Sequence, residues 1–178
     1  MKKKLVVCTL CGMIAMSAIT CGMGDKAFAA EQGETSVIAT LNEGEQIPNP
    51  WKDYTSVKEA EDAAGFSVKL PKKINGYTKD AIQAIDGSIL QVIYKNGDKE
   101  ILIRKALVSQ GKDISGDYNA YDVTKKVTVK GKQGKVTIKG TDKKKKLAVW
   151  SNKTYSYSLY TSAGMSQKAL IKLIKQVQ

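Results

Sequence analysis

The chain has 178 residues, a formal net charge of +12 and no histidine. This length is sufficient for one domain with a hydrophobic core. The lack of histidine removes the commonest general base and the commonest zinc ligand, so the composition argues against an enzyme and against a zinc site.

The first 29 residues have the pattern of a signal peptide. Lysines at positions 2–4 precede an apolar stretch over residues 5–19 that is short for a transmembrane helix, and Ala27-Phe28-Ala29 is a small-x-small cleavage motif. We expect cleavage between Ala29 and Ala30 and a secreted or envelope-associated protein. An uncleaved anchor and a lipoprotein attached through Cys21 are the alternatives. All three cysteines lie in this segment, so cleavage leaves no thiol for a disulfide or a metal.

Positive charge is concentrated in the C-terminal part of the chain. Residues 1–29 hold four of the 29 basic and one of the 17 acidic residues, which leaves 25 against 16 and a net charge of +9. Residues 123–178 contain 14 lysines and one acid, Asp142, whereas residues 30–122 contain 11 basic and 15 acidic residues. Such asymmetry indicates a contact with an anionic partner or a role in solubility rather than a particular fold.

A single domain is expected over residues 49–178, after a polar, flexible tether over residues 30–48 that carries four glutamates. The domain begins with a short helix. Ser56 followed by Glu59 is a capping box, and Gly65 suits the position after the last helical turn. A second helix, capped by Ser166, follows near the C-terminus, with apolar residues at i, i+3 and i+4 spacing.

Between these helices the pattern changes to that of strands. Residues 66–70 alternate between apolar and polar side chains, and residues 82–107 predict two hairpins with turns at Asp86-Gly87 and Asn96-Gly97. Further strands are expected over residues 123–130, 135–139, 147–150 and 155–160. The sequence therefore predicts an α+β fold: an antiparallel meander sheet of about six to eight strands, covered by an N-terminal and a C-terminal helix.

Four segments resemble domain of unknown function 4367, a family of exported Gram-positive proteins that also occurs on the outer side of anti-sigma factors. They are Asn49-Pro50-Trp51, the helix over residues 56–65, residues 66–70 with Pro71, and the loop Asp-Ile-Ser-Gly-Asp-Tyr-Asn-Ala-Tyr over residues 113–121. The resemblance covers roughly residues 49–178 and implies an α+β domain outside the cytoplasm. It brings no catalytic residues.

The first candidate site is a lysine surface. We expect one sheet face and the adjoining hairpin tip to present eight lysines: Lys126, Lys130, Lys135, Lys139, Lys143, Lys144, Lys145 and Lys146. Lysine suits diffuse attraction to phosphates, so the expected partner is an anionic envelope polymer or a membrane surface. The alternative is that these lysines only block edge pairing and keep the protein soluble.

The second candidate is the long, turn-rich loop over residues 109–122, because long ordered loops often carry function. Its candidate residues are Asp113, Ser115, Asp117, Tyr118, Asn119, Tyr121 and Asp122. The oxygen ligands at alternate positions resemble half of a calcium loop, but Gly116 comes one residue early and no glutamate closes the site. The alternative is a loop whose Asx side chains bond their own backbone.

The aromatic residues form a third candidate, a carbohydrate platform, with core and cross-strand packing as the alternative. The set comprises Tyr118, Tyr121, Trp150, Tyr155, Tyr157 and Tyr160. We find no catalytic motif, no phosphate loop and no cofactor signature.

We therefore predict a non-catalytic binding or sensing domain at the Gram-positive cell envelope, without cofactor, metal or nucleic acid. The alternative is a regulatory module that contacts another envelope protein through the loop over residues 109–122.

Overall fold

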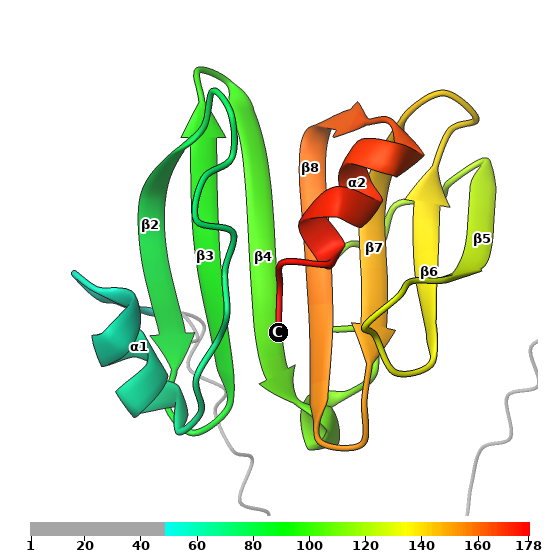
Figure 1. The fold of residues 1–178 in the computed structure, drawn as a ribbon. Helices are drawn as coiled ribbons and strands as arrows, with labels where there is room; N and C mark the ends of the chain where they lie inside the picture. The colour runs from blue at the N-terminus through cyan, green and yellow to red at the C-terminus, as the bar shows by residue number, and fades with distance from the viewer. Residues whose placement is uncertain (1–48) are drawn as a thin grey trace, which may run out of the picture. The chain divides into compact units, whose positions relative to one another are not determined.

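The computed structural model describes residues 49–178 (Figure 1). The predicted signal peptide, the Ala29/Ala30 cleavage site and the tether lie outside this range. Eight strands and two α-helices follow one another: β1 (Lys52–Asp53), α1 (Val57–Ala64), β2 (Thr78–Ile85), β3 (Ile89–Asn96), β4 (Lys99–Leu107), β5 (Val123–Thr128), β6 (Lys135–Gly140), β7 (Lys145–Ser151), β8 (Tyr155–Met165) and α2 (Gln167–Ile174). A short 3₁₀ turn, Val108–Gln110, follows β4. None of the helices in this range has the length and hydrophobicity to cross a bilayer.

All eight strands form one open antiparallel sheet in the order β1-β2-β3-β4-β8-β7-β6-β5. The α+β class and the antiparallel sheet are confirmed. The order is not one continuous meander, however, because β4 pairs with β8 instead of β5. The chain after β4 crosses the sheet and begins β5 at the far edge, and the second run of strands then returns to β4 (Figure 1). β1, which the sequence did not predict, pairs with β2 at the opposite edge.

The ends of α1 follow the predicted capping pattern. Ser56 Oγ accepts a hydrogen bond from the Glu59 amide at 3.2 Å, and Gly65 adopts φ 78°, the left-handed conformation that favours glycine. The Glu59 carboxylate reaches back to the Thr55 amide and hydroxyl. The predicted capping box is therefore completed one residue earlier than expected.

The hairpin turns differ slightly from prediction. Ile85 pairs with Ile89, so the first loop has three residues and includes Ser88. In the second hairpin Asn96 pairs with Lys99, which leaves Gly97 and Asp98 as the turn. Gly97 has φ 54°, a conformation that type I′ turns require at this position.

The helices pack on one side of the sheet, which we call the helix side. α1 contacts β2 and β3, and α2 contacts β7 and β8. The register places Ile103, Leu159 and Ala148 in one row across β4, β8 and β7, and all three are buried. Leu170 and Ile174 of α2 are fully buried in the same core cluster. The predicted apolar face of the C-terminal helix is confirmed, because its buried residues are those that packing on the sheet requires.

The strand predicted over residues 66–70 is not formed. This segment crosses the helix side as an extended chain, and Lys69 exchanges two backbone hydrogen bonds with Gln178, at 2.7 and 3.0 Å. Phe66 is buried in the core. The alternation of apolar and polar residues over positions 66–70 thus reflects burial of one face of the segment. No strand of the described residues lies beside the segment to form the hydrogen-bond ladder of a β-sheet with it.

The opposite side of the sheet, which we call the loop side, is covered by the segment over residues 108–122. Ala106, Ile114, Leu147 and Val149 are buried but lie outside the main core cluster. Ile89 and Ile93 of β3 add apolar surface on this side, where they pair with Ala106 and Leu102, and such a face needs a cover.

Candidate functional site

Arg104 of β4 holds the loop to the sheet. Its Nη1 donates hydrogen bonds to the carbonyls of Ser115, at 2.6 Å, and Ile114, at 3.2 Å. Its Nε donates to Gln91 Oε1 at 2.7 Å. Gln91 lies opposite Arg104 in β3. A side chain from the middle of the sheet therefore satisfies backbone carbonyls of a loop that has no strand partner of its own.

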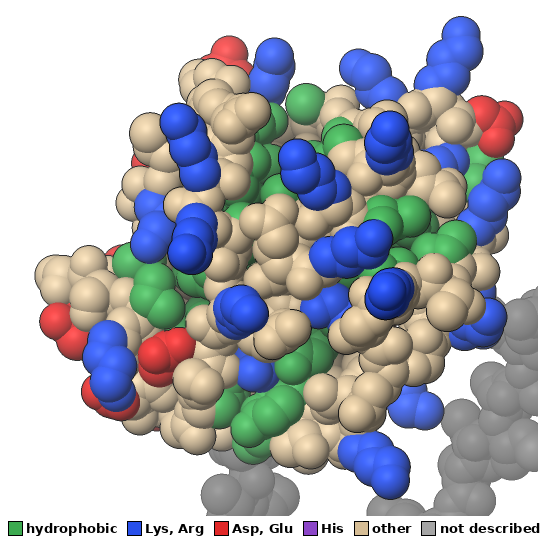
Figure 2. All heavy atoms as spheres, in the orientation of Figure 1, with side chains coloured by type: hydrophobic (Ala, Val, Ile, Leu, Met, Phe, Trp, Pro, Cys, Tyr) green, Lys and Arg blue, Asp and Glu red, His purple; other side chains and the backbone are tan. Residues whose placement is uncertain are grey.

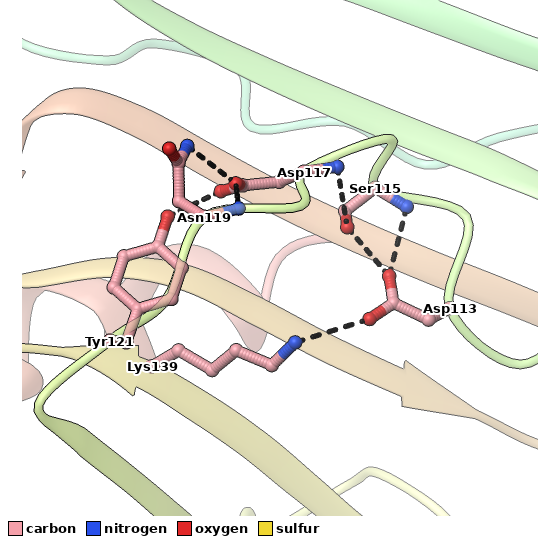
Figure 3. A network of polar contacts seen from close by, with 6 residues as sticks. All are labelled: Asp113, Ser115, Asp117, Asn119, Tyr121 and Lys139. Carbon is pink, nitrogen blue, oxygen red and sulfur yellow. Dashed lines mark hydrogen bonds and ion pairs between the residues drawn. The ribbon is translucent and has the colours of Figure 1, made fainter. Parts of the chain in front are cut away.

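Within the loop, Asp and Ser side chains bond the backbone two residues on (Figure 3). Asp113 Oδ1 accepts hydrogen bonds from the Ser115 amide and hydroxyl, at 3.1 and 2.6 Å. Asp117 Oδ1 accepts from the amide and side chain of Asn119, at 2.9 and 2.7 Å, and its Oδ2 accepts from the Tyr121 hydroxyl. These are the Asx turns that the sequence allowed as the alternative to a calcium loop.

The electrostatics of the loop follow from these bonds. Burial raises the pKa of Asp113, but bonds from Ser115 and the neighbouring Lys139 outweigh it and bring the pKa below its usual value. Asp117 behaves likewise, since bonds from Tyr121 and Asn119 outweigh burial. Burial, followed by the bond to Asp117, raises the pKa of Tyr121. Both carboxylates are therefore ionised at neutral pH, Asp117 held by bonds within the loop and Asp113 by the loop and by Lys139 of β6.

The loop carboxylates do not converge on a common point. Asp113 and Asp117 direct their oxygens at separate turns (Figure 3), and within residues 49–178 no three acidic side chains are placed to hold a metal ion. The geometry therefore lends no support to the calcium alternative.

Beside the loop lies a groove of about 380 Å³. Its floor and walls come from β4, β8 and the loop, and its lining consists of Glu100, Leu102, Arg104, Ser115, Gly116, Asp117, Tyr118, Asn119 and Tyr160. A second hollow of about 260 Å³ shares Asn119 and Tyr160 and extends to Lys146. At the rim, Tyr118 is 98% exposed. It is the one large hydrophobic side chain of the described residues that is fully open to solvent.

Five of the eight predicted anion-contact lysines have exposed side chains: Lys126, Lys130, Lys135, Lys143 and Lys144. Lys126 and Lys135 lie on the loop side of β5 and β6, where their registers place them beside Thr137 and Thr128. Lys130 lies in the turn between these strands, and Lys143 and Lys144 lie in the turn at the other end of β6. The expected single face is therefore divided among a two-stranded ribbon and two distant turns.

The other three predicted lysines are not free surface cations. Lys145 is buried and donates to the carbonyls of Thr141 and Asp142, because the register shift between Lys145 and Leu147 turns it into the hairpin. Lys139 forms an ion pair with Asp113 at 3.3 Å. Lys146 is half-buried in the second hollow. The prediction that Lys145 and Lys139 lie on an open basic surface is wrong.

A different set of lysines surrounds α2 on the helix side. Lys168, Lys172 and Lys175 are exposed on the helix, and Lys73 lines the same hollow as Lys172. At the end of the helix, the half-buried Lys132 donates to the Val177 carbonyl. Figure 2 shows basic side chains spread over this side of the molecule, with acidic ones near α1 and at the margins. The sequence could have indicated this set, because the spacing of positions 168, 172 and 175 places the three lysines on one polar stripe of the helix.

The aromatic residues divide between the two sides. Trp150 and Tyr157 are buried on the helix side, with ring centroids 5.3 Å apart and nearly parallel planes, and Tyr155 packs against that core. Tyr118, Tyr121 and Tyr160 line the loop-side hollows. The six residues therefore do not form one platform: Trp150, Tyr155 and Tyr157 follow the alternative of core packing, and only the other three face the loop-side hollows.

The eight-stranded antiparallel sheet and its two helices define an α+β domain whose long loop covers the face opposite the helices. Residues 68–177, more than half of the chain, match the family described as domain of unknown function (DUF4367). The chain belongs to this family, as the resemblance in the sequence indicated. No curated protein and no solved structure matches the chain.

Proposed function

We propose that this protein is a non-catalytic domain that acts outside the cytoplasm, at a Gram-positive cell envelope, and binds an anionic polymer or membrane surface there. The observation that carries the proposal is the charge around α2. Three hollows border the helix and its C-terminal extension, and the described residues that line them include Lys73, Lys132, Lys168, Lys172 and Lys175 but no Asp or Glu.

Among residues 49–178 these cations have no acidic partner within ion-pair distance. No lysine on α2 takes part in an ion pair within the described part of the chain. Burial, and then the charge of Lys69, lowers the pKa of Lys132, so two like charges lie close together. A polyanion that docks here removes this repulsion, and it gains attraction from several point charges at once.

The α2 side also offers apolar contact. The largest of the three hollows, about 690 Å³, includes Ala169 and the half-buried Ile171 among the lysines. Lysine stems cover apolar surface while their ammonium groups stay in water. A surface that combines lysines with apolar area suits a phosphate-bearing polymer or lipid head groups better than the exposed lysines of β5 and β6 alone do.

Binding to charged vesicles and to a soluble polyanion tests the proposal. The chain is mixed with phosphatidylglycerol vesicles, phosphatidylcholine vesicles and immobilised long-chain polyphosphate at rising salt. We expect binding to the two anionic probes only, with a steep loss as salt increases. Changing Lys168, Lys172 and Lys175 to Gln is expected to weaken binding at least tenfold.

A matched variant removes the same charge elsewhere. Lys58, Lys99 and Lys112 lie on α1, at the start of β4 and in the loop, and their change to Gln is expected to lower affinity about twofold through net charge alone. Equal losses in the two triple variants, or binding that does not depend on salt, would contradict a specific α2 surface.

A second function is favoured by the exposure of Tyr118. An aromatic side chain that is 98% exposed, on a loop fixed by Arg104 and by its own Asx turns, is suited to contact another envelope protein. This regulatory role predicts that partner binding survives the three lysine changes on α2 and is lost when Tyr118 becomes Ala.

A further inference from the structure

The groove beside the loop has opposite charges at its two ends. Glu100 and Arg104 both point to the loop side from β4, four residues apart, which corresponds to about 13 Å along a strand. The space between them is lined by Leu102 and by Tyr160, which pairs with it across β4 and β8. The groove therefore has an apolar floor and a dipolar charge pattern.

The cationic end has hydrogen-bonding capacity left over. Nε and Nη1 of Arg104 donate to the protein, whereas Nη2 donates to none of residues 49–178. None of the described carboxylates lies within ion-pair distance of this half-buried guanidinium. A guanidinium that is partly withdrawn from water and has free N–H groups is a strong site for a ligand carboxylate.

Gly116 lets the loop pack directly against Arg104. A Cβ at this position would lie 2.8 Å from Nη1 of Arg104, and the backbone has φ 64°. Any larger residue would therefore push against the guanidinium as well as strain the loop. The absence of a side chain allows Nη1 to reach the loop carbonyls, which leaves Nη2 as the group that faces a ligand.

The anionic end is also unpaired. The Glu100 carboxylate makes no hydrogen bond or ion pair in the part of the chain that the structure describes, although its backbone amide donates to Ser162 Oγ at 2.8 Å. Lys95, the residue opposite Glu100 in β3, is bound to Asp80 at 2.8 Å. Glu100 is therefore free to accept an ammonium or amide donor.

We propose that this groove binds a short, extended peptide segment with its carboxylate at Arg104 and an ammonium group at Glu100. A zwitterion of about four residues spans the distance between the two charges. Its backbone lies over Leu102 and Tyr160, and Tyr118 closes over it from the rim. Glu100 and Asp117 would repel a polyanion here, so this ligand differs from that of the α2 surface. The assignment deepens the second proposed function, contact with another protein, by naming the chemistry that the loop recognises.

Tetra-alanine with free termini is a direct probe. In a titration of the full chain followed by ¹H-¹⁵N NMR, we expect saturable shifts at Leu102, Tyr118 and Tyr160, with a dissociation constant of about 1 mM. Acetylating the amine or amidating the carboxylate is expected to weaken binding at least fivefold. Di-alanine, which reaches only one charge, is expected to bind as weakly as the capped forms.

Three variants distinguish peptide binding in this groove from non-specific binding elsewhere on the protein. Glu100→Gln is expected to weaken free tetra-alanine about fivefold and to leave the N-acetylated peptide unchanged. Tyr118→Ala, at a side chain open to solvent, is expected to weaken both peptides without altering the fold. Arg104→Gln is expected to abolish binding, and the other two variants test the groove even if that change disturbs the loop. Lys126→Gln, outside the groove, is the control.

The assignment is overturned if capped and free peptides bind alike, or if Glu100→Gln changes both peptides equally. Polyphosphate displacing tetra-alanine from the groove would also contradict it, because it would assign the loop side to polyanions. Retention on anionic vesicles is measured on the same variants and is expected to stay unchanged. Loss of that retention with peptide binding intact would count against the α2 proposal alone.

Discussion

The helix side and the loop side cover the same eight strands by different means. On the helix side, fully buried Leu170 and Ile174 are in contact with a continuous apolar core. On the loop side, the cover is held above a few buried aliphatic residues by hydrogen bonds that Arg104 donates and that Asp113 and Asp117 accept. Apolar contacts hold over a wide range of pH, whereas charge-assisted bonds need a defined geometry and protonation state. The loop side is therefore the part of the domain that conditions or partners can alter.

Matched truncations on the two sides measure the largest difference. Leu170→Ala is expected to lower the free energy of unfolding by about 4 kcal/mol, because the rigid core cannot collapse into the cavity. Ile114→Ala is expected to lower it by about 2 kcal/mol, since the loop above it can settle. Urea denaturation followed by circular dichroism gives both values.

An exposed neighbour on the same helix is the control. Lys168→Ala is expected to change stability by less than about 0.5 kcal/mol. If Ile114→Ala costs as much as Leu170→Ala, the loop side has a rigid core of its own and the contrast fails.

Two glycines with similar backbone angles give a second comparison. Gly116 has φ 64° and Gly65 has φ 78°, so alanine at either position costs about 1–2 kcal/mol in the left-handed conformation. At Gly116 the new Cβ would meet Arg104 Nη1 at 2.8 Å, whereas at Gly65 no atom of the described residues lies within 4 Å of the Cβ position. We expect Gly116→Ala to cost about 3 kcal/mol and Gly65→Ala about 1.5 kcal/mol.

The amide signals of Ile114 and Ser115 show where the extra cost arises. They are expected to move in Gly116→Ala and to stay in place in Gly65→Ala, because Arg104 must release their carbonyls to make room. Unchanged signals in both variants would show that the guanidinium adapts without losing its bonds.

The contrast between the sides also explains which features could be predicted from sequence. The strands, the capped helices and the inward Val136 and Ile138 follow from alternation, turn residues and caps, which act over short distances. The Asx turns of the loop are likewise visible as Asp113 and Asp117 two residues before their partners.

Features that depend on long-range pairing were not predictable. The pairing of β4 with β8 brings residues about 50 positions apart together, and no local pattern marks it. Arg104 was overlooked because the carbonyls it binds have no sequence signature. Lys105 belongs to the same class: it is buried on the helix side, donates to the Ser67 carbonyl at 2.7 Å and lies 4.1 Å from the Tyr155 ring centroid. From the sequence alone, a lysine within an apolar strand is expected to be exposed to solvent, because the aromatic side chains that surround it come from distant segments.

On the helix side, replacing one buried tyrosine is expected to raise the free energy of unfolding instead of lowering it. The Tyr94 hydroxyl is buried and has no hydrogen-bond partner within residues 49–178, and burial raises the pKa of Tyr94 to about 12. Tyr94→Phe removes the unsatisfied group and is expected to stabilise the protein by about 1 kcal/mol.

The same substitution changes the response to alkali. Because the folded-state pKa of Tyr94 lies above its unfolded value of about 10, the unfolded chain loses the proton first, and stability falls between about pH 10 and pH 12. Thermal melts across this range are expected to show a smaller fall for Tyr94→Phe than for the wild type. Parallel curves would mean that the hydroxyl finds a partner in solution.

The smallest effect, and the one confined to the loop side, is expected in acid. The pKa values of Asp113 and Asp117 lie below the usual range, so the unfolded or detached loop takes up protons before the folded one does. The stabilisation is complete above about pH 4 and is lost as pH falls through the folded-state values. Amide signals of Ser115 and Asn119, followed by NMR from pH 7 to pH 2, should therefore move in acid while signals from α2 stay fixed.

Asp113→Asn should remove the step at Ser115 and leave the step at Asn119, since each carboxylate serves its own turn. If both steps disappeared together, the two turns would form one cooperative unit joined through the loop, and the loop side would open as a whole rather than turn by turn.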